Sequence, residues 1–164
     1  MIISLCGFMG CGKSTVGKLL SEQTGLTFID SDEYIEKKTN MKITDIFRNY
    51  GEEKFREIET EAIKELCNKE NIILSLGGGV LKRDENTDIL RQKSTVVFID
   101  TPFETLCQRL KADGDTRPLI IGKSDEEIKE LYISRLPMYK SESHISVSGK
   151  TSEEVSEKIV DKLF

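Results

Sequence analysis

Short apolar runs rich in β-branched residues alternate along the chain with longer segments of helical periodicity. Runs of this length and composition predict β-strands, and the longer segments between them predict crossover helices. The expected strands are Ile2–Cys6, Thr27–Ile29, Ile72–Leu76, Thr95–Ile99 and His144–Val147. This alternation is typical of an α/β fold, in which helices cover both faces of a mostly parallel sheet. Because no repeat or linker divides the sequence, we expect one domain over residues 1–164.

Two insertions interrupt the alternation. Residues 31–68 are long enough for more than one helix, and Gly51 is expected to break the first of them. The helix that follows carries an apolar stripe at helical spacing, made of Phe55, Ile58, Ala62 and Leu66. The second insertion, KADGDTRPLIIGKS at 111–124, is polar and contains glycine near both ends, which predicts a loop of the length that often serves as a lid.

The composition narrows the class of protein. The chain of 164 residues is 37% hydrophobic with a formal net charge of −5, so we expect a folded domain without a nucleic-acid partner, which would require a basic surface. No apolar run approaches the roughly 18 residues of a membrane span. The first residues, MIISLCG, lack the features of a signal peptide. The four cysteines and the single histidine show no metal-ligand spacing, so we expect reduced thiols in a cytoplasmic protein. No sustained heptad or exposed apolar stripe suggests an oligomer, so we expect a monomer.

The most specific motif is GFMGCGKST at residues 7–15, which matches the phosphate-loop pattern G-x-x-x-x-G-K-[ST]. It lies between an expected strand and an expected helix, where its glycines let backbone N–H groups face the phosphates of a nucleotide. We expect Lys13 to reach the β- and γ-phosphates and the Ser14 hydroxyl to bind Mg²⁺. The guanine-reading motif N-K-x-D is approached only by NKEN at 68–71, which lacks the aspartate, so a G protein is disfavoured.

Two aspartates at strand ends compete for the water shell of the metal ion. Asp100 leads into TPFE, where a role in helix entry accounts for it, whereas Asp30 has no such explanation and is preferred. Asp32 lies two residues further along, so one carboxylate would serve the Mg²⁺ shell while the other accepts a proton from an incoming hydroxyl. The alternative is that both aspartates cap the helix that begins near Glu33.

Three arginines are candidates for binding anionic groups. Arg135 continues the inward face of DEEIKELYISRLPMY, where a buried guanidinium needs an internal carboxylate or an anionic ligand, and the sequence leaves both open. Arg117, in DTRPL, would reach the transferring phosphoryl group from the loop at 111–124. Arg56 flanks the apolar stripe, where a solvated surface arginine is equally expected.

Three consecutive glycines, Gly77, Gly78 and Gly79, follow the expected strand Ile72–Leu76. The carboxyl ends of parallel strands form the edge at which open α/β sheets bind ligands. Since the nucleotide has its own loop at 7–15, we expect this second loop to bring backbone N–H groups close to a phosphate acceptor. A flexible strand-to-helix turn is the alternative.

Together these motifs resemble the shikimate kinase family. The matching segments are, in order, GFMGCGKST, FIDSDEYIE, DIFRNYGEEKFREIE, LSLGGGV, TRPLI and SRLPMY, which run from Gly7 to Tyr139. The resemblance implies a three-layer P-loop kinase fold, with a five-stranded parallel sheet in the order 2-3-1-4-5 flanked by helices. It also implies a substrate-binding subdomain at residues 31–61 and a lid at 111–124.

The resemblance implies transfer of the γ-phosphate of ATP to the 3-hydroxyl of shikimate, with Mg²⁺ as cofactor. The implied catalytic residues are Lys13, Asp32 and Arg117. The implied ATP-binding residues are Gly10, Cys11, Gly12, Lys13, Ser14, Thr15, Arg109 and Arg117, with Lys111 as an alternative to Arg109 at the adenine. The implied acceptor-binding residues are Asp32, Arg56, Gly77, Gly78, Gly79 and Arg135. The implied metal-binding residues are Ser14 and, through water, Asp30.

Two other functions remain open. A kinase of the same fold with another anionic acceptor, such as gluconate or a nucleoside monophosphate, would share these motifs. Arg56 and Arg135 indicate that the acceptor is anionic but do not identify it. A nucleotide-sensing domain that has lost catalysis would keep the fold but lack a catalytic group. All of the expected catalytic and metal-binding side chains are present, which favours an enzyme.

Overall fold

The computed structural model describes residues 1–112 and 122–164, and within them five strands form one parallel sheet. Their bounds are β1 Ile2–Cys6, β2 Thr27–Asp30, β3 Ile72–Ser75, β4 Thr95–Ile99 and β5 Ile145–Val147. The sheet order is β2-β3-β1-β4-β5, which confirms the expected order, and each adjacent pair is parallel. The strand ends differ from the prediction by one residue at three places: β2 includes Asp30, β3 ends before Leu76, and β5 begins after His144.

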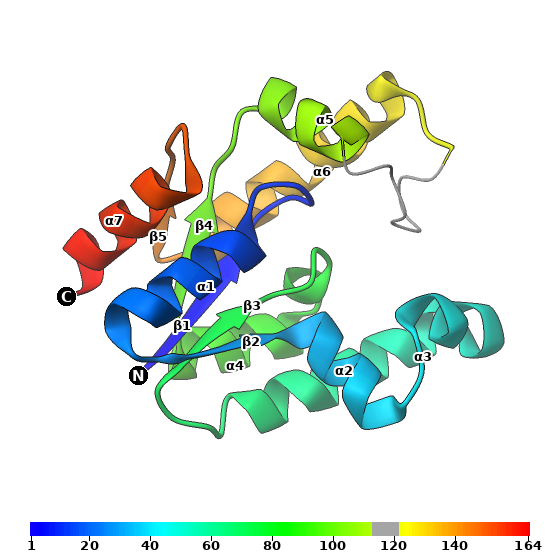
Figure 1. The fold of residues 1–164 in the computed structure, drawn as a ribbon. Helices are drawn as coiled ribbons and strands as arrows, with labels where there is room; N and C mark the ends of the chain where they lie inside the picture. Colours follow the sequence, from blue (N-terminus) through cyan, green and yellow to red (C-terminus); the bar gives the residue numbers. More distant parts are fainter. Residues whose placement is uncertain (113–121) are drawn as a thin grey trace.

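Helices cover both faces of the sheet (Figure 1). The α-helices are α1 Lys13–Thr24, α2 Ser31–Thr39, α3 Ile43–Leu66, α4 Asp84–Lys93, α5 Phe103–Ala112, α6 Asp125–Glu142 and α7 Ser152–Leu163, and a 3₁₀ turn, η1, covers Val80–Lys82. In Figure 1, α1 lies in front of the sheet beside α7, which it contacts, whereas α4 and α6 lie behind the sheet. The three-layer architecture is thereby confirmed. Within the described part of the chain, no helix combines the length and the apolarity that a membrane crossing requires.

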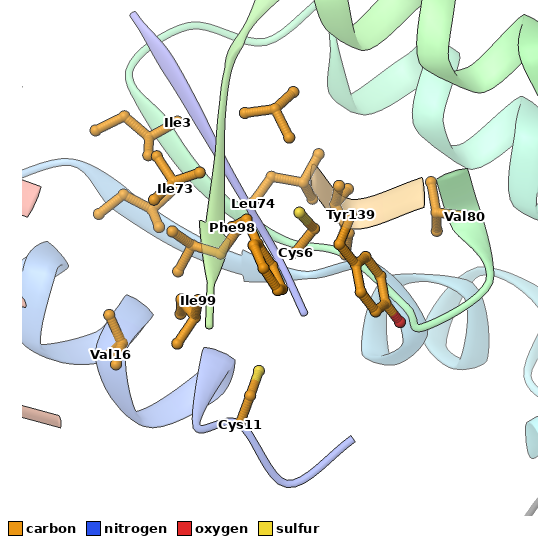
Figure 2. Packing of buried hydrophobic residues seen from close by; sticks show 14 of the residues in the cluster. Ile3, Cys6, Cys11, Val16, Ile73, Leu74, Val80, Phe98, Ile99 and Tyr139 are labelled. Atoms are coloured by element: carbon orange, nitrogen blue, oxygen red, sulfur yellow. The ribbon is translucent and has the colours of Figure 1, made fainter. Parts of the chain in front are cut away.

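The sheet is buried because its central strands are apolar on both faces. Every residue of β1 and of β3 is buried, whereas edge strand β2 is more exposed. Figure 2 shows this core around Phe98 of β4, whose ring stacks on that of Tyr139 of α6 with centroids 5.4 Å apart. The Tyr139 hydroxyl donates to the Gly78 carbonyl at 3.1 Å. The core therefore ties α6 directly to the loop that follows β3.

A second apolar cluster holds α2 and α3 together. Its buried members are Ile35, Ile46, Phe55 and Ala62. Gly51 has φ 85° and ψ 172° and kinks α3, so the predicted helix break is confirmed. Phe55, Ala62 and Leu66 of the predicted stripe are buried, and Ile58 packs at the edge of the cluster. Residues on both sides of the kink thus have a small core of their own.

Gly17 sets how closely α1 packs against β2. A Cβ atom at this position would lie 2.3 Å from Cε2 and 2.6 Å from Cδ2 of Phe28, well inside van der Waals contact. We therefore expect Gly17→Ala to lower the free energy of unfolding by about 1–3 kcal/mol, the usual cost of overpacking. Chemical denaturation of Gly17→Ala, Phe28→Leu and the double variant measures this. The smaller leucine should recover part of the loss, and fully additive losses in the double variant would contradict the contact.

Candidate functional site

A cleft of about 640 Å³ opens at the carboxyl edge of the sheet. Its walls combine the phosphate loop (residues 7–15), the junction of β2 and α2, the kinked helix α3, the triple-glycine loop (residues 77–79) and α6. The expected site residues that line it are Gly10, Gly12, Lys13, Ser14, Thr15, Asp30, Asp32, Arg56, Gly77, Gly78, Gly79, Arg109 and Arg135. Segments that are far apart in the sequence therefore meet in one cleft.

The phosphate loop curls at two glycines. Gly10 has φ 83° and Gly12 has φ 92°, left-handed conformations that a side chain disfavours. Gly12 is also the N-cap of α1, so the helix begins directly at the loop with its positive end. Lys13 Nζ donates to the Gly7 carbonyl at 2.8 Å and to the Phe8 carbonyl at 3.5 Å. The loop's own carbonyls therefore hold this ammonium, and a bound phosphate must compete with them.

Ser14 and Asp30 come from different elements and lie side by side. The Ser14 hydroxyl donates to Asp30 Oδ2 at 3.4 Å. Asp30 Oδ1 accepts from the backbone N–H groups of Asp32 at 2.9 Å and of Glu33 at 3.0 Å, which makes Asp30 the N-cap of α2. The preferred interpretation, in which Asp30 has no role in helix entry, is therefore wrong, and the alternative of a helix cap is right for Asp30. One carboxylate oxygen caps the helix, and the other faces Ser14.

This pair offers only oxygen ligands, which suit a hard cation such as Mg²⁺. Across residues 1–112 and 122–164, no three His, Cys, Asp or Glu side chains are grouped so that they could hold a metal ion by themselves. A magnesium ion bound together with a nucleotide needs no such group, because phosphate oxygens and water supply most of its ligands. Ser14 and Asp30 thus fit a hydroxyl ligand and a carboxylate that acts through water.

Asp32 lies in the first turn of α2, with its carboxylate against the triple-glycine loop. Burial raises the pKa of Asp32 to about 7, and the negative charges of Asp30 and Glu59 add to this effect, whereas the Lys13 ammonium opposes it. A carboxyl group with a pKa near neutrality can exchange a proton with a bound hydroxyl group. The surroundings of Asp32 therefore suit a proton acceptor.

Arg56 is held by a carboxylate that the sequence analysis missed. Its Nη1 donates to Glu59 Oε1 at 2.8 Å, and Glu59 is only 1% exposed. Burial raises the pKa of Glu59, although the guanidiniums of Arg56 and Arg135 oppose the rise. The available signal was the i,i+3 spacing of Arg56 and Glu59, because residues three apart share one face of a helix. Arg56 is itself buried, so the alternative of a solvated surface residue is excluded.

Arg135 is buried without a partner. It is 3% exposed, and no hydrogen bond of normal geometry reaches its Nε, Nη1 or Nη2 atom from residues 1–112 and 122–164. The Tyr139 hydroxyl and the Glu59 carboxyl lie near enough for the Arg135 charge to lower their pKa values, but neither forms a well-aligned pair with it. Burying an unpaired charge is costly, so a buried guanidinium normally pairs with an anion. The sequence left open an internal carboxylate or an anionic ligand. Since none of the described carboxylates forms an ion pair with Arg135, the structure favours the ligand.

The triple-glycine loop uses part of its backbone internally. The Gly77 N–H donates to Ser31 Oγ at 2.9 Å, and the Gly78 carbonyl accepts from Tyr139. The expected approach of backbone N–H groups to an acceptor therefore does not extend to Gly77. It remains a prediction for Gly78 and Gly79.

Arg109 and Lys111 differ in where their charges lie. Arg109 lines the cleft, and its Nη1 donates to the Gly10 carbonyl at 3.0 Å. Lys111 pairs instead with Asp125 at 2.8 Å, and both side chains are exposed. Of the two alternatives for the adenine, the geometry favours Arg109.

The structure gives no side-chain role to two of the expected site residues, Cys11 and Arg117. The Cys11 side chain is 3% exposed beneath the phosphate loop, so only its backbone can contact a phosphate. Arg117 and most of the expected lid at 111–124 lie outside the described residues. The role of Arg117 therefore stays a prediction from the sequence.

Comparisons with known proteins agree on one family. The family model described as "Shikimate kinase" matches residues 9–164. A shikimate kinase of Persephonella marina is 43% identical over 162 residues, which cover 98% of this chain and 98% of that protein. A shikimate kinase of Thermus thermophilus is 42% identical over 164 residues, which cover 99% of this chain and 89% of that protein. The solved structure of shikimate kinase from Acinetobacter baumannii in complex with shikimate matches with a TM-score of 0.91 and 34% identity, covering 99% of this chain and 92% of that one.

The buried charge of Arg135 should lower the stability of the ligand-free protein. Replacing it by methionine, which fills a similar volume without a charge, should raise the free energy of unfolding of the ligand-free protein by about 1 kcal/mol or more. Arg48→Met is the matched control, because that side chain is 75% exposed and should change stability by less than about 0.5 kcal/mol. Chemical denaturation measures both. If Arg135→Met is the less stable of the two, Arg135 has a structural partner and the interpretation fails.

Proposed function

Because this chain belongs to the shikimate kinase family, we propose that it transfers the γ-phosphate of ATP to the 3-hydroxyl of shikimate, giving shikimate 3-phosphate and ADP. This is a step of the shikimate pathway to aromatic amino acids. The observation that carries the proposal is the buried, unpaired guanidinium of Arg135, in the same cleft as the phosphate loop. A nucleotide site and an anion site thus share one cavity.

Two guanidiniums at one end of the cleft favour an acceptor that carries an anionic group. Arg56 is paired with Glu59 at 2.8 Å and with Glu52 at 3.5 Å, whereas Arg135 forms no ion pair among the described residues. A carboxylate bound at Arg135 would supply the missing partner. We therefore assign the acceptor carboxylate to Arg135 and Arg56.

The reaction needs a donor and a hydroxyl in line. Asp32 accepts the proton of the attacking hydroxyl and orients it, for which its raised pKa is suited. Lys13 exchanges its loop carbonyls for the β- and γ-phosphates and stabilises the transferring group together with Arg117. Mg²⁺, when bound, neutralises charge on the phosphates, and Ser14 and Asp30 are the residues that would hold it, Asp30 through water.

The other parts of the chain are assigned to ATP, to the acceptor and to the lid. The phosphates of ATP lie against residues 10–15, and Arg109 lies beside the adenine. Residues 31–61 form the acceptor-binding subdomain, supported by the separate apolar cluster of α2 and α3. The assignment of residues 111–124 as the lid rests on the sequence resemblance, because most of that segment lies outside the described residues. All four cysteines are free, as expected for a cytoplasmic protein, and we propose that it acts as a monomer.

The identity of the acceptor can be tested directly. A coupled ADP-release assay should give the highest kcat/KM with shikimate in a panel that also contains quinate, gluconate and AMP. The reason is that the chain belongs to the shikimate kinase family. Faster turnover of quinate, gluconate or AMP would replace the proposal with a kinase of the same fold for that acceptor. Absence of turnover with tight ATP binding would support a nucleotide-sensing domain instead.

Asp32→Asn tests the proton acceptor. The amide keeps the size of the carboxyl but cannot accept the proton, so kcat should fall roughly 10²- to 10⁴-fold while ATP affinity is kept. Steady-state kinetics and calorimetric titration with ATP measure the two quantities. Asp88→Asn, on the exposed face of α4, is the control and should leave both unchanged. A rate for Asp32→Asn close to that of the wild type would remove Asp32 from the mechanism.

A further inference from the structure

We infer that each residue of the triple-glycine loop makes room for the charged end of one acceptor-binding side chain. Gly77 leaves room for Asp32, Gly78 for Arg135 and Gly79 for Arg56. The loop is then a positioning device, in which the missing side chains matter more than backbone freedom. The inference rests on the proposed function, because that function assigns these three charged groups to the acceptor.

Backbone conformation does not explain these glycines. In the described residues, the glycines with positive φ are Gly7, Gly10, Gly12, Gly25, Gly51 and Gly122. None of residues 77–79 is among them, and Gly79 has φ −106° and ψ 4°. Alanine could adopt the backbone angles of Gly79, and neither Gly77 nor Gly78 has the left-handed φ that favours glycine. The requirement for glycine must therefore lie in the space that surrounds the loop.

The space beside each glycine is filled by a different charged group. A Cβ atom at Gly77 would lie 2.8 Å from Asp32 Oδ1. At Gly78 it would lie 2.9 Å from Arg135 Nη1. At Gly79 it would lie 2.6 Å from both Nη1 and Nη2 of Arg56. All of these distances are shorter than van der Waals contact, so an added methyl group must displace the charged end that touches it.

Because the three glycines are consecutive, the charged groups that contact them lie along a short stretch of main chain. Asp32 comes from α2, Arg56 from α3 and Arg135 from α6, so three separate elements deliver their charges to three adjacent residues. Adjacent Cα atoms are about 3.8 Å apart, so the three contacts span at most roughly 7.6 Å of main chain. The loop thereby gathers the three charged groups along a short stretch of main chain.

The loop itself is held in place. Tyr139 donates to the Gly78 carbonyl, and Ser31 accepts from the Gly77 N–H. Just beyond, the fully buried Asn86 donates from Nδ2 to the Val80 carbonyl at 2.8 Å. Because the main chain is anchored from three sides, an added methyl group should move the side chain in front of it and not the loop.

The three positions should differ in their effect on stability. Asp32 and Arg135 meet the loop through the ends of flexible side chains, which can turn aside without disturbing the fold. Arg56 is fixed by its 2.8 Å bond to Glu59, and a Cβ atom at Gly79 would also lie 2.8 Å from its Cζ. Gly79→Ala should therefore break the Arg56–Glu59 pair and lower the Tm. Gly77→Ala and Gly78→Ala should leave the Tm nearly unchanged.

Steady-state kinetics of the alanine variants, with shikimate and ATP, tests the inference. Gly78→Ala should raise KM for shikimate about 10- to 100-fold with a smaller change in kcat, the effect of losing a charged hydrogen bond to the substrate. Gly77→Ala should instead lower kcat about 10- to 100-fold with a smaller change in KM, because it displaces the proton acceptor. KM for ATP should stay within about twofold in both variants.

Gly25→Ala is the matched control. Gly25 has φ +77° and no atom within 4 Å of an added Cβ, so alanine strains only the backbone there. This variant should lower the Tm while leaving kcat and both KM values unchanged. It separates a general loss of stability from a change in the acceptor site.

A double-mutant cycle identifies the side chain through which Gly78 acts. If Gly78 acts through Arg135, Gly78→Ala should raise KM for shikimate no further in an Arg135→Ala background. The inference is overturned if the two substitutions raise KM independently, so that their factors multiply in the double variant. It is also overturned if the three alanine variants change kcat and KM alike or not at all. In either case, turnover of shikimate by the wild-type protein would still uphold the proposed function. Wild-type protein that does not phosphorylate shikimate would overturn both.

Discussion

The proposed acceptor site depends on one buried charge that has no ion-pair partner among the described residues. Arg135 is buried on α6 at the carboxyl edge of the sheet, and the described residues give it no hydrogen-bond partner. The neighbouring Arg56 is already matched by buried Glu59. A protein keeps a buried guanidinium unpaired only at a cost in stability, so its persistence indicates a ligand that completes the pair. In this account that ligand is the carboxylate of the acceptor, and the phosphate loop in the same cleft binds ATP, the phosphate donor.

Two glycine-rich loops flank this cleft, and they use glycine for different physical reasons. In the phosphate loop, Gly10 and Gly12 adopt left-handed backbone angles that let the chain curl around an anion. In the triple-glycine loop, no residue has a left-handed φ, and the missing side chains leave room for charged groups. The first loop therefore binds through its main chain. The second arranges side chains that come from three other elements.

Much of the fold and part of the site could be predicted from the sequence. Apolar runs located the strands to within one residue, because strands buried on both faces are nearly continuous in their apolarity. The sheet order came only from the resemblance to a family, since periodicity does not state which strands pair. The cap formed by Asp30 was only the alternative, because the sequence does not show that its two oxygens serve different partners. Glu59 could have been found from its i,i+3 spacing to Arg56, although the spacing does not show that the pair is buried. The anchor formed by Tyr139 was missed because it is a tertiary contact 61 residues away in the sequence.

The most direct test of the account is a crystal structure of the protein with shikimate, ADP and Mg²⁺. The account predicts that the shikimate carboxylate lies within about 3.2 Å of guanidinium nitrogens of Arg135 and Arg56, and that the 3-hydroxyl lies equally close to Asp32. A carboxylate bound elsewhere, with Arg135 still unpaired or turned toward an acid of the protein itself, would contradict it.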